Sequence, residues 1–210
     1  MAQVKICGLR HHDQVAAAAA AGARYVGLVF FARSPRAVTA AEAAAVAGQV
    51  PAGVARVGLF VDPDDDLLDR TLARVPLDIV QLHGSESPDR VAAVKALTGL
   101  PVMKAVGLSD AADLPALTDY GLVADMLLVD AKPPKGADLP GGNGLAFDWR
   151  LLAGRRWLRP WMLAGGLNPG NVAEAIRLTG APAVDVSSGV ETVPGVKDAA
   201  LIRAFVAAAS

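Results

Sequence analysis

Short apolar stretches alternate with longer helix-forming stretches along the whole chain. The apolar stretches are rich in β-branched and aliphatic residues, a composition that predicts strands. Eight strands are expected, over residues 4–9, 25–30, 56–61, 78–83, 102–106, 125–130, 161–164 and 183–187. Most of them start about 20 to 25 residues after the one before, which suits strand–helix units joined by short loops.

Helix signals fill the segments between these strands. Gly22 is placed to end the first helix, and Thr39 with Glu42 predicts a capping box at the start of the second. Ser87 followed by Pro88 marks a later helix start. The expected helices cover about residues 12–21, 39–50, 62–75, 88–97, 110–119, 148–152, 168–178 and 196–208.

The strands are apolar almost throughout, which is typical of parallel strands covered on both faces. Eight strand–helix units without a linker predict one α/β domain over residues 1–210, a closed (β/α)8 TIM barrel. The alternative is an open doubly wound sheet, for which about six strands usually suffice. Two long loops, residues 31–38 and 131–146, follow carboxyl ends of strands, where barrel active sites lie.

Composition narrows the class of protein. Hydrophobic residues make up 53% and charged residues 20% of the chain, which excludes intrinsic disorder. The formal net charge of −1 argues against a nucleic-acid partner. The single cysteine, Cys7, excludes an intrachain disulfide and fits a reducing compartment. Because no leader-like start and no bilayer-spanning apolar run is visible, we expect a cytoplasmic protein without a membrane partner. Because the helices are polar on one face and show no long apolar surface stripe, we expect a monomer rather than a homodimer.

Two loops near the end of the chain predict a phosphate site. LAGGLNPGNV (163–172) joins the seventh strand to a helix, and DVSSGVE (185–191) contains the end of the eighth strand and the loop after it. Small residues let the backbone approach a ligand, and their N–H groups can surround an anion. Ordinary turns would explain one Gly-Gly pair, but TIM barrels often bind phosphate with these two loops together. The candidates are Gly165, Gly166, Ser187, Ser188 and Gly189.

Four further candidate side chains lie at or after the carboxyl ends of predicted strands. Cys7 lies near the end of the first strand, and it is either a catalytic group or an inert thiol of the core. Asp130 ends the sixth strand, where an acid is either catalytic or a loop cap. Arg36 follows the second strand and could hold a carboxylate through forked hydrogen bonds, or be solvated. His83 ends the fourth strand and either lines the pocket or lies at its rim. Three isolated histidines and one cysteine predict no metal site.

Strand parity gives a test of the barrel. Side chains alternate along a strand, so Lys5 points inward if Cys7 does, and Asp185 points inward if Ser187 lines the mouth. The first and eighth strands are neighbours in a closed barrel. Because a buried charge needs a partner, we expect Lys5 and Asp185 to interact inside the barrel.

Seven motifs, taken together, closely resemble the phosphoribosylanthranilate isomerase family of tryptophan biosynthesis. With PGVKD at 194–198, they cover nearly the whole chain and match in both order and spacing. The motifs are KICGL (5–9), FFARSPRAV (30–38), VGLFV (57–61), VQLHG (80–84), GGNGLAFDW (141–149), LAGGLNPGNV (163–172) and VDVSSGVE (184–191).

The resemblance implies a cofactor-free Amadori rearrangement of N-(5-phosphoribosyl)anthranilate to 1-(2-carboxyphenylamino)-1-deoxyribulose 5-phosphate. It implies Cys7 as general base, Asp130 as general acid, and Arg36 as the group that binds the anthranilate carboxylate. An apolar, semi-closed site would help the Asp130 carboxyl to keep its proton. A thiol acts as a base only if its pKa falls below about 8.5, and the sequence assigns no group to lower it. Lys5 is too far along the same face to be assumed for this role.

Three departures from the family pattern concern loops rather than catalytic positions. Arg10 and Asn143 replace threonines that are more common in the family. The segment PPKGADLP (133–140) lengthens the loop after the sixth strand, and we expect this loop to close over the substrate.

Three other functions remain as alternatives. The related histidine-pathway isomerase would carry an acid in place of Cys7 and a second phosphate loop after the third and fourth strands. A Schiff-base aldolase would need a lysine nucleophile, either Lys104 or Lys5. A non-catalytic barrel that binds a phosphorylated metabolite would not need Cys7 together with Asp130.

Overall fold

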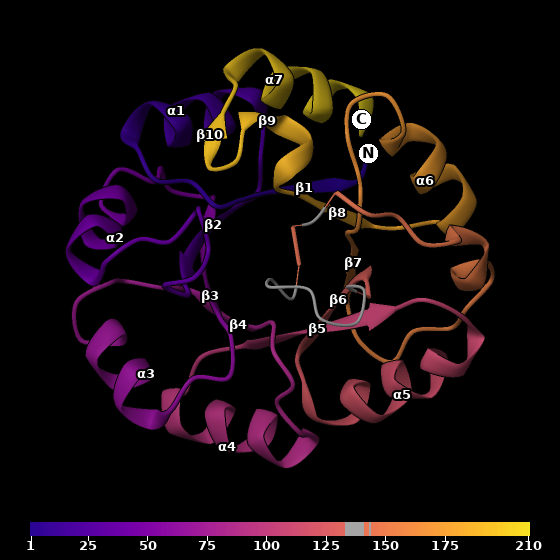
Figure 1. The fold of residues 1–210 in the computed structure, drawn as a ribbon, viewed down its shortest axis with the longest axis horizontal. Coiled ribbons are helices and arrows are strands. Elements are labelled where there is room, and N and C mark those ends of the chain that lie inside the picture. The colour runs from indigo at the N-terminus through magenta and orange to yellow at the C-terminus, as the bar shows by residue number, and fades with distance from the viewer. Residues whose placement is uncertain (133–140, 143) are drawn as a thin grey trace.

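The eight predicted strands form one closed parallel barrel (Figure 1). The computed structural model describes residues 1–132, 141–142 and 144–210. Each strand pairs in parallel with the next, and β1 also pairs with β8, so the open doubly wound sheet is wrong. The barrel strands are β1 (Gln3–Cys7), β2 (Tyr25–Phe30), β3 (Ala55–Phe60), β4 (Ile79–Leu82), β5 (Val102–Leu108), β6 (Met126–Ala131), β7 (Trp161–Leu163) and β8 (Ala183–Val186).

Helices surround the barrel as an outer ring (Figure 1). The first ends at Gly22, which adopts φ 100°, and the second begins with the predicted capping box of Thr39 and Glu42. A shared apolar core fills the space between the helices and the outward faces of the strands. The α-helices are α1 (His12–Ala21), α2 (Ala40–Ala47), α3 (Asp65–Leu72), α4 (Pro88–Thr98), α5 (Leu114–Val123), α6 (Val172–Thr179) and α7 (Ala199–Ala208). Short 3-10 helices are η1 (Ala111–Asp113), η2 (Trp149–Leu152) and η3 (Ser188–Val190).

Several helix starts differ from the sequence expectation because the capping residue lies further along the chain. Asp64, rather than Asp62 or Pro63, caps α3 by accepting a hydrogen bond from the Leu67 N–H. The helix expected from Asn168 begins only at Val172, after a turn. Expected boundaries elsewhere also move by a few residues, most of all at α5.

The last helix was predicted to begin too early. Val196 and Lys197 belong to a two-stranded antiparallel hairpin, β9 (Glu191–Val193) and β10 (Val196–Lys197), and α7 starts after the Asp198 cap. Pro194 and Gly195 form the turn, and Gly195 adopts the left-handed φ of +84°. A Pro-Gly pair between two valine-rich segments is a turn signal that could have found this hairpin.

Inward-facing side chains divide the barrel interior into an apolar floor and a functional upper layer. Met103, Leu128 and Met162 pack together in the floor. Above it, Cys7 packs with Val29 of β2 and Leu59 of β3. The barrel is therefore a filled core whose upper end carries the polar groups.

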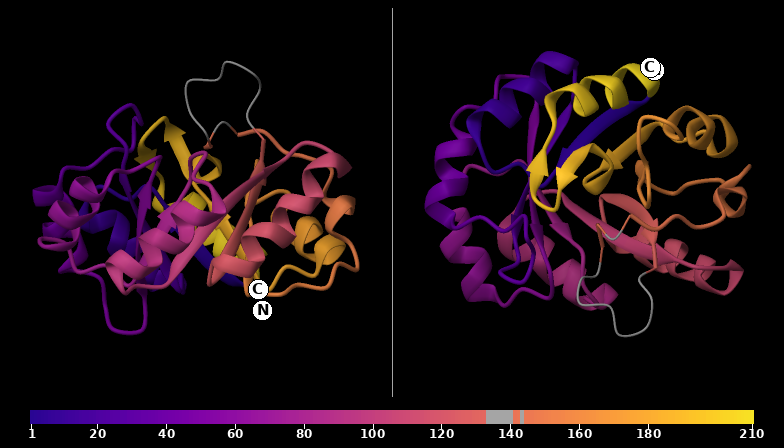
Figure 2. Two further views of the ribbon diagram at one scale, coloured as in Figure 1. Left: turned by 90° about the horizontal axis from the view of Figure 1, so that it is seen from below. Right: turned by 45° about the horizontal axis from the view of Figure 1, so that its top comes forward.

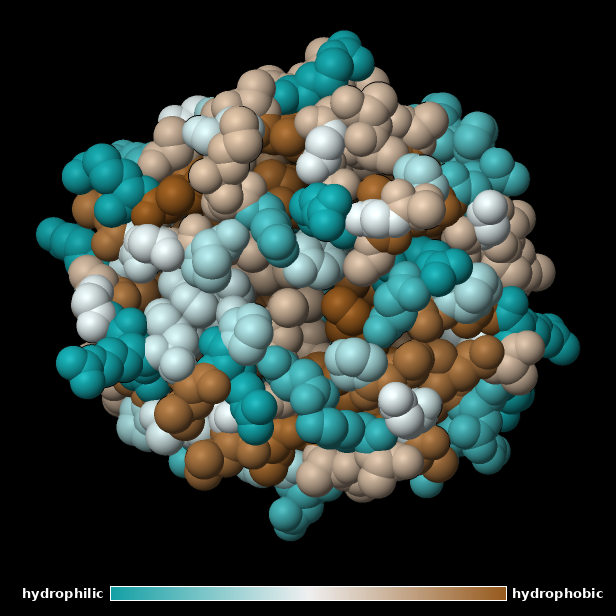
Figure 3. Space-filling view, turned by 180° about the vertical axis from the view of Figure 1, so that it is seen from behind, coloured by the Kyte–Doolittle hydropathy of each residue, from teal (hydrophilic) through white to brown (hydrophobic). Residues whose placement is uncertain are grey.

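The two chain termini lie together on one side of the barrel, away from the carboxyl ends of the strands (Figure 2). The face seen from behind shows polar and apolar residues intermixed (Figure 3). No helix among the described residues is long and apolar enough to cross a membrane.

Candidate active site

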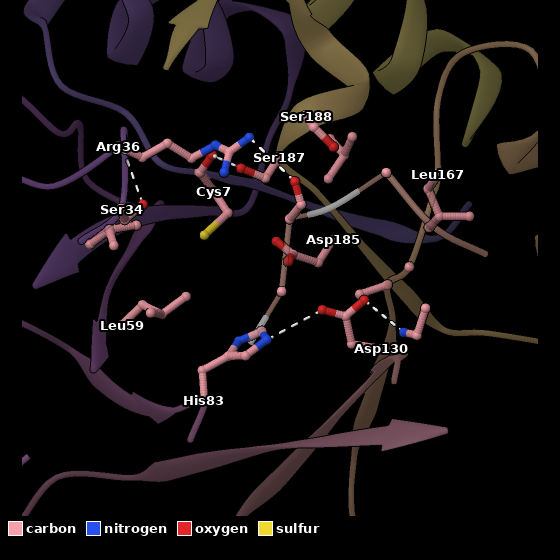
Figure 4. A pocket seen from close by; sticks show the side chains of 18 of the residues that line it. Cys7, Ser34, Arg36, Leu59, His83, Asp130, Leu167, Asp185, Ser187 and Ser188 are labelled. Atoms are coloured by element: carbon pink, nitrogen blue, oxygen red, sulfur yellow. Dashed lines mark hydrogen bonds and ion pairs between the residues drawn. The ribbon is translucent and has the colours of Figure 1, made fainter. Parts of the chain in front are cut away.

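A pocket opens at the carboxyl ends of the barrel strands and collects nearly every predicted site residue (Figure 4). All of the named candidates line it except Gly189. The lining candidates are Cys7, Arg36, His83, Asp130, Gly165, Gly166, Ser187 and Ser188. The candidates from the sequence therefore lie together in one pocket, whose wall also contains many residues that were not candidates.

Cys7 lies at the end of β1 with its side chain against an apolar wall. It is 4% exposed and packs with Val29 and Leu59. Gly27, opposite it on β2, leaves the room that the sulfur occupies, since a Cβ there would lie 2.8 Å from Cys7 Sγ. A larger residue at position 27 would displace the thiol.

Lys5 and Asp185 form the predicted ion pair inside the barrel. They are register partners on β1 and β8, and Lys5 Nζ donates to Asp185 Oδ1 at 2.8 Å. Lys5 is fully buried. Burial alone would lower the pKa of Lys5, but Asp185 outweighs it and raises that pKa, so the lysine is held charged.

The charges around Cys7 act in opposite directions. Burial is the largest influence and raises the pKa of the Cys7 thiol, and Asp185 adds to this rise. Lys5 and, more weakly, Lys197 lower the pKa, but the net direction is upward. Lys5 therefore acts on the thiol, contrary to the expectation from the sequence, but burial makes the Cys7 thiol harder to ionise than an ordinary cysteine.

Asp130 lies at the end of β6, across the pocket from Cys7 (Figure 4). Its Oδ1 accepts a hydrogen bond from the Ala131 N–H at 2.8 Å. Its Oδ2 lies 3.2 Å from His83 Nε2. His83 thus lines the pocket and contacts Asp130.

Arg36 is buried at the pocket wall and is already paired with a carboxylate of the chain. Its Nε and Nη2 each donate to Glu191 at 2.8 Å, in the forked geometry that the sequence suggested for a substrate carboxylate. Nη2 also lies 3.5 Å from the Gly142 carbonyl oxygen. Nη1 is the guanidinium nitrogen that has no hydrogen bond among the described residues.

Glu191 is shared between Arg36 and a second buried cation, Lys197. Lys197 Nζ donates to Glu191 Oε1 at 2.6 Å, and also to the Ser187 carbonyl and hydroxyl oxygens at 3.0 and 3.2 Å. Burial opposes ionisation of Glu191, but the two cations outweigh it and lower its pKa. Burial lowers the pKa of Lys197 despite the attraction of Glu191. The β9–β10 hairpin thereby fixes the loop after β8.

The two predicted phosphate loops meet at the pocket. Gly165 and Gly166 follow β7 with φ of +84° and +64°, which lets consecutive backbone groups turn toward the cavity. Ser187 and Ser188 face them from the end of β8, and Ser187 Oγ donates to the Cys7 carbonyl oxygen at 3.1 Å. Gly189 does not line the pocket; it packs so closely on the Leu167 carbonyl oxygen that a side chain would not fit.

Three residues in contact with the site were missed from the sequence: Gln81, Glu191 and Lys197. Gln81 shares the inward face of β4 with His83 and could have been found by the same parity that paired Lys5 with Asp185. Glu191 and Lys197 lie within the family-like motifs but had no assigned role. The segment PPKGADLP (133–140) and Asn143, on which the loop-closure expectation rests, lie outside the described residues.

Lys104 does not face the pocket. Its Nζ donates to Glu86 Oε2 at 2.8 Å and to the Gly84 carbonyl oxygen at 2.7 Å, on the outer side of the barrel wall. Lys5, the other lysine considered, is held charged by Asp185. A Schiff base requires a neutral amine open to substrate, so the aldolase alternative is disfavoured.

Comparisons with known proteins all indicate the same family. A family model described as N-(5'phosphoribosyl)anthranilate (PRA) isomerase matches residues 4–208. A Paracoccus denitrificans protein named N-(5'-phosphoribosyl)anthranilate isomerase is 71% identical over 207 residues, which cover 99% of this chain and 96% of the relative. A Rhodospirillum centenum protein of the same name is 64% identical over 209 residues, covering 99% and 98%.

Solved structures agree with the sequence relatives. The phosphoribosyl anthranilate isomerase of Thermotoga maritima superposes with a TM-score of 0.89 at 36% identity, covering 100% of this chain and 98% of that one. A phosphoribosyl anthranilate isomerase in complex with reduced 1-(o-carboxyphenylamino)-1-deoxyribulose 5-phosphate gives 0.84 at 34% identity, with the same coverage. The resemblance seen in the sequence is thereby confirmed: this chain belongs to the N-(5'-phosphoribosyl)anthranilate isomerase family.

Proposed function

We propose that this chain catalyses the Amadori rearrangement of N-(5-phosphoribosyl)anthranilate to 1-(2-carboxyphenylamino)-1-deoxyribulose 5-phosphate, in tryptophan biosynthesis. The observation that carries the proposal is the placement of Cys7 and Asp130 across one pocket, with the two glycine- and serine-rich loops in its wall. The name of the bound compound in a related solved structure supports the same substrate class.

The pocket offers a separate anchor for each part of this substrate. The phosphate would lie against the backbone of Gly165, Gly166 and Ser188, where turned peptide groups favour an anion. The apolar wall beside Cys7 suits the anthranilate ring. Nη1 of Arg36 would meet the anthranilate carboxylate, while Glu191 keeps the guanidinium plane fixed through the other two nitrogens. Anchoring at both ends holds the ribose between acid and base.

Ring opening is the task of Asp130. A protonated Asp130 carboxyl would donate to the furanose ring oxygen as the bond from that oxygen to C1 breaks. The lone pair of the anthranilate nitrogen then forms the C1–N double bond of an iminium ion. The hydroxyl produced stays on C4 of the opened sugar, and Asp130 is left as a carboxylate.

Proton abstraction is the task of Cys7. The Cys7 thiol would first lose its proton to solvent, and the resulting thiolate would take the C2 proton. The electrons of that C–H bond form a C1–C2 double bond as the iminium nitrogen becomes neutral. The enolamine then takes a proton at C1 and releases the proton of the C2 hydroxyl, which gives the ketone. C1 is reduced and C2 is oxidised within one molecule, so the step balances without an external redox partner.

The thiol that this chemistry needs must stay reduced. A cytoplasmic location is therefore part of the proposal, because reducing compartments keep single cysteines free. A small phosphorylated substrate is the proposed partner. A monomer also stays a prediction, to be measured by analytical ultracentrifugation, although a Thermotoga maritima relative is described as dimeric.

The test follows anthranilate fluorescence after freshly made phosphoribosylanthranilate is added to the purified protein. Cys7→Ala and Asp130→Asn should each lower kcat about a hundredfold or more with little change in KM, because each removes a proton-transfer group. Asp66→Asn, which changes a carboxylate whose side chain is 82% exposed, is the matched control and should match wild type. A folded wild-type protein without isomerase activity would refute the proposal, and full activity in either site variant would refute that residue's role.

A further inference from the structure

A fully buried glutamine lies directly behind the histidine that contacts Asp130. Gln81 and His83 are two residues apart on β4 and share its inward face. Gln81 Nε2 lies 2.9 Å from His83 Nδ1, and His83 Nε2 lies 3.2 Å from Asp130 Oδ2. A continuous chain of hydrogen-bonding groups therefore runs from the barrel interior to the proposed acid.

The direction of the Gln81–His83 hydrogen bond depends on the tautomer of His83, and the amide orientation in the structure corresponds to one of the two tautomers. A side-chain NH2 can only donate, so His83 Nδ1 must accept and carries no proton. The neutral imidazole then has its one proton on Nε2 and donates it to Asp130. Asp130 receives a second hydrogen bond from the Ala131 N–H, so this arrangement suits a carboxylate. The His83–Asp130 pair holds one proton in this state and has none to give to a ring oxygen.

The same orientation leaves an unsatisfied group. Among the described residues, Gln81 Oε1 is buried without any hydrogen-bond partner. An orphaned buried acceptor is costly and uncommon, and it points to a function for the side chain that bears it. Turning the amide end for end would place Oε1 against His83 Nδ1.

In the turned orientation the proton count changes. A carbonyl oxygen can only accept, so Nδ1 must carry a proton. The remaining proton lies between His83 Nε2 and Asp130 Oδ2, and the pair holds two protons in place of one. This is the state in which Asp130 can protonate the furanose oxygen, and loss of that proton restores the arrangement seen in the structure.

We propose that Gln81 is a positioning residue that sets the number of protons on the His83–Asp130 pair through the orientation of its amide. The inference rests on the proposed acid role of Asp130. The extra proton enters from solvent with the turn of the amide, passes to the ring oxygen during ring opening, and is replaced by the proton that the C2 hydroxyl releases.

The other charged groups that face the pair are already neutralised by partners. From β1, Lys5 is paired with Asp185 of β8. From the loop after β2, Arg36 is paired with Glu191.

On the β5 side, Lys104 is paired with Glu86 outside the barrel wall. Cys7 faces the pair across the pocket as a protonated thiol. The pocket residues from β3 are apolar. Gln81 is thus the polar group in contact with Nδ1.

The test combines the pH dependence of kcat with nitrogen NMR of the histidine side chains in Gln81→Met and Gln81→Glu. The chain has three histidines, and a His83→Asn spectrum identifies the signals of His83. Gln81→Met has similar length and adds no charge, so it should fold. We expect it to lower kcat about tenfold or more with a smaller change in KM, and to abolish the single Nδ1-unprotonated tautomer of resting His83.

Gln81→Glu presents only acceptors to Nδ1. This variant should protonate His83 Nδ1 in the resting enzyme. It should also move the high-pH limb of the kcat profile to higher pH, because the His83–Asp130 pair keeps its second proton up to a higher pH. Gln14→Glu, a buried amide whose Oε1 accepts from the Arg10 N–H at 2.8 Å, is the matched control and should change neither measurement.

Two outcomes separate the inference from the function on which it rests. An inactive, folded wild type would reject the isomerase proposal itself. An active wild type, with a folded Gln81→Met variant whose kcat profile and His83 signals match it, would overturn the role of Gln81 alone.

Discussion

Asp185 is the residue whose replacement tests the charge balance of the barrel interior most directly. Asp185→Asn keeps the shape of the side chain but removes the charge that faces Lys5 Nζ at 2.8 Å. Lys5 is fully buried and cannot reach water. Breaking a buried pair in this way costs about 3–5 kcal/mol, because one charge is left uncompensated.

That loss is large against the total stability of a folded domain, which is about 5–15 kcal/mol. For a chain of this length, about 1 kcal/mol corresponds to a melting-temperature change of roughly 2–4 °C, so the variant should melt about 6–20 °C lower. Urea unfolding followed by circular dichroism measures the free energy of unfolding directly. Asp66→Asn is the control: its ion pair with Arg70 is exposed, and its loss should cost less than about 1 kcal/mol.

The same variant should make the thiol easier to ionise. Asp185 raises the pKa of Cys7, so replacing this carboxylate removes one of the influences that oppose ionisation of the thiol. The thiol should therefore titrate at a lower pH than in wild type. Ultraviolet thiolate absorbance reports a single thiol because the chain has one cysteine, and Cys7→Ala gives the background to subtract.

A double variant separates stability from thiol chemistry. Lys5→Met with Asp185→Leu replaces the buried pair by apolar groups and should recover most of the lost stability. Its thiol should nevertheless titrate above that of Asp185→Asn, since the lysine is gone. The reasoning is refuted if Asp185→Asn costs less than about 1 kcal/mol, or if its thiol titrates at a higher pH than wild type.

Two further predictions concern the loop after β6 and the acid stability of the fold. Gly141→Ala would place a methyl group against His83 Nε2 and 2.8 Å from Asp130 Oδ2. Because this displaces the His83–Asp130 pair, we expect kcat to fall about tenfold or more with the melting temperature unchanged. A variant with the kcat of wild type would contradict this expectation. Burial opposes ionisation of Asp113, but hydrogen bonds from Lys132 and Ser109 lower its pKa from 3.8 to about 2. Because the pKa of Asp113 in the folded state lies below its ordinary value, ionised Asp113 stabilises the fold above pH 4. This contribution, about 2 kcal/mol in urea unfolding curves, is lost as the pH falls toward 2. Asp113→Asn should lack this loss, and a pH dependence identical to that of wild type would contradict the assignment.

The barrel and much of its site were predictable because they follow from periodic patterns. Apolar runs located all eight strands, and the (β/α)8 count placed their carboxyl ends around one mouth. The alternation of side chains along the strands then predicted the contact between Lys5 and Asp185, which are 180 residues apart in the sequence, because β1 and β8 are neighbours in the closed barrel. These inferences needed no knowledge of loops.

The contacts that the sequence did not reveal are made by irregular segments. The sequence predicted that Arg36 binds the carboxylate of the substrate through two forked hydrogen bonds. In the structure, Arg36 makes such a pair of hydrogen bonds, but to the carboxylate of Glu191, which lies 155 residues further along the chain. Neither residue lies on a barrel strand, so no periodic pattern relates them. Gln81 is different: parity could have given its inward position, whereas its contact with His83 Nδ1 depends on side-chain torsion angles that no sequence pattern encodes.

Glu191 and Lys197, which had no role assigned from the sequence, contribute to the balance of charge around Cys7. Three buried cations, Lys5, Arg36 and Lys197, lie on the β1 side of the pocket, and two carboxylates, Asp185 and Glu191, balance them. Among the described residues on this side of the pocket, the buried cations outnumber the buried carboxylates by one, and an unbalanced charge acts strongly where the dielectric is low. Burial raises the pKa of the Cys7 thiol despite this surplus. When the substrate displaces water and brings its own anions to the phosphate loops and to Arg36, the charges around the thiol change. The protonation state of the proposed base should therefore depend on the bound ligand, and thiol titration with and without inorganic phosphate measures that dependence.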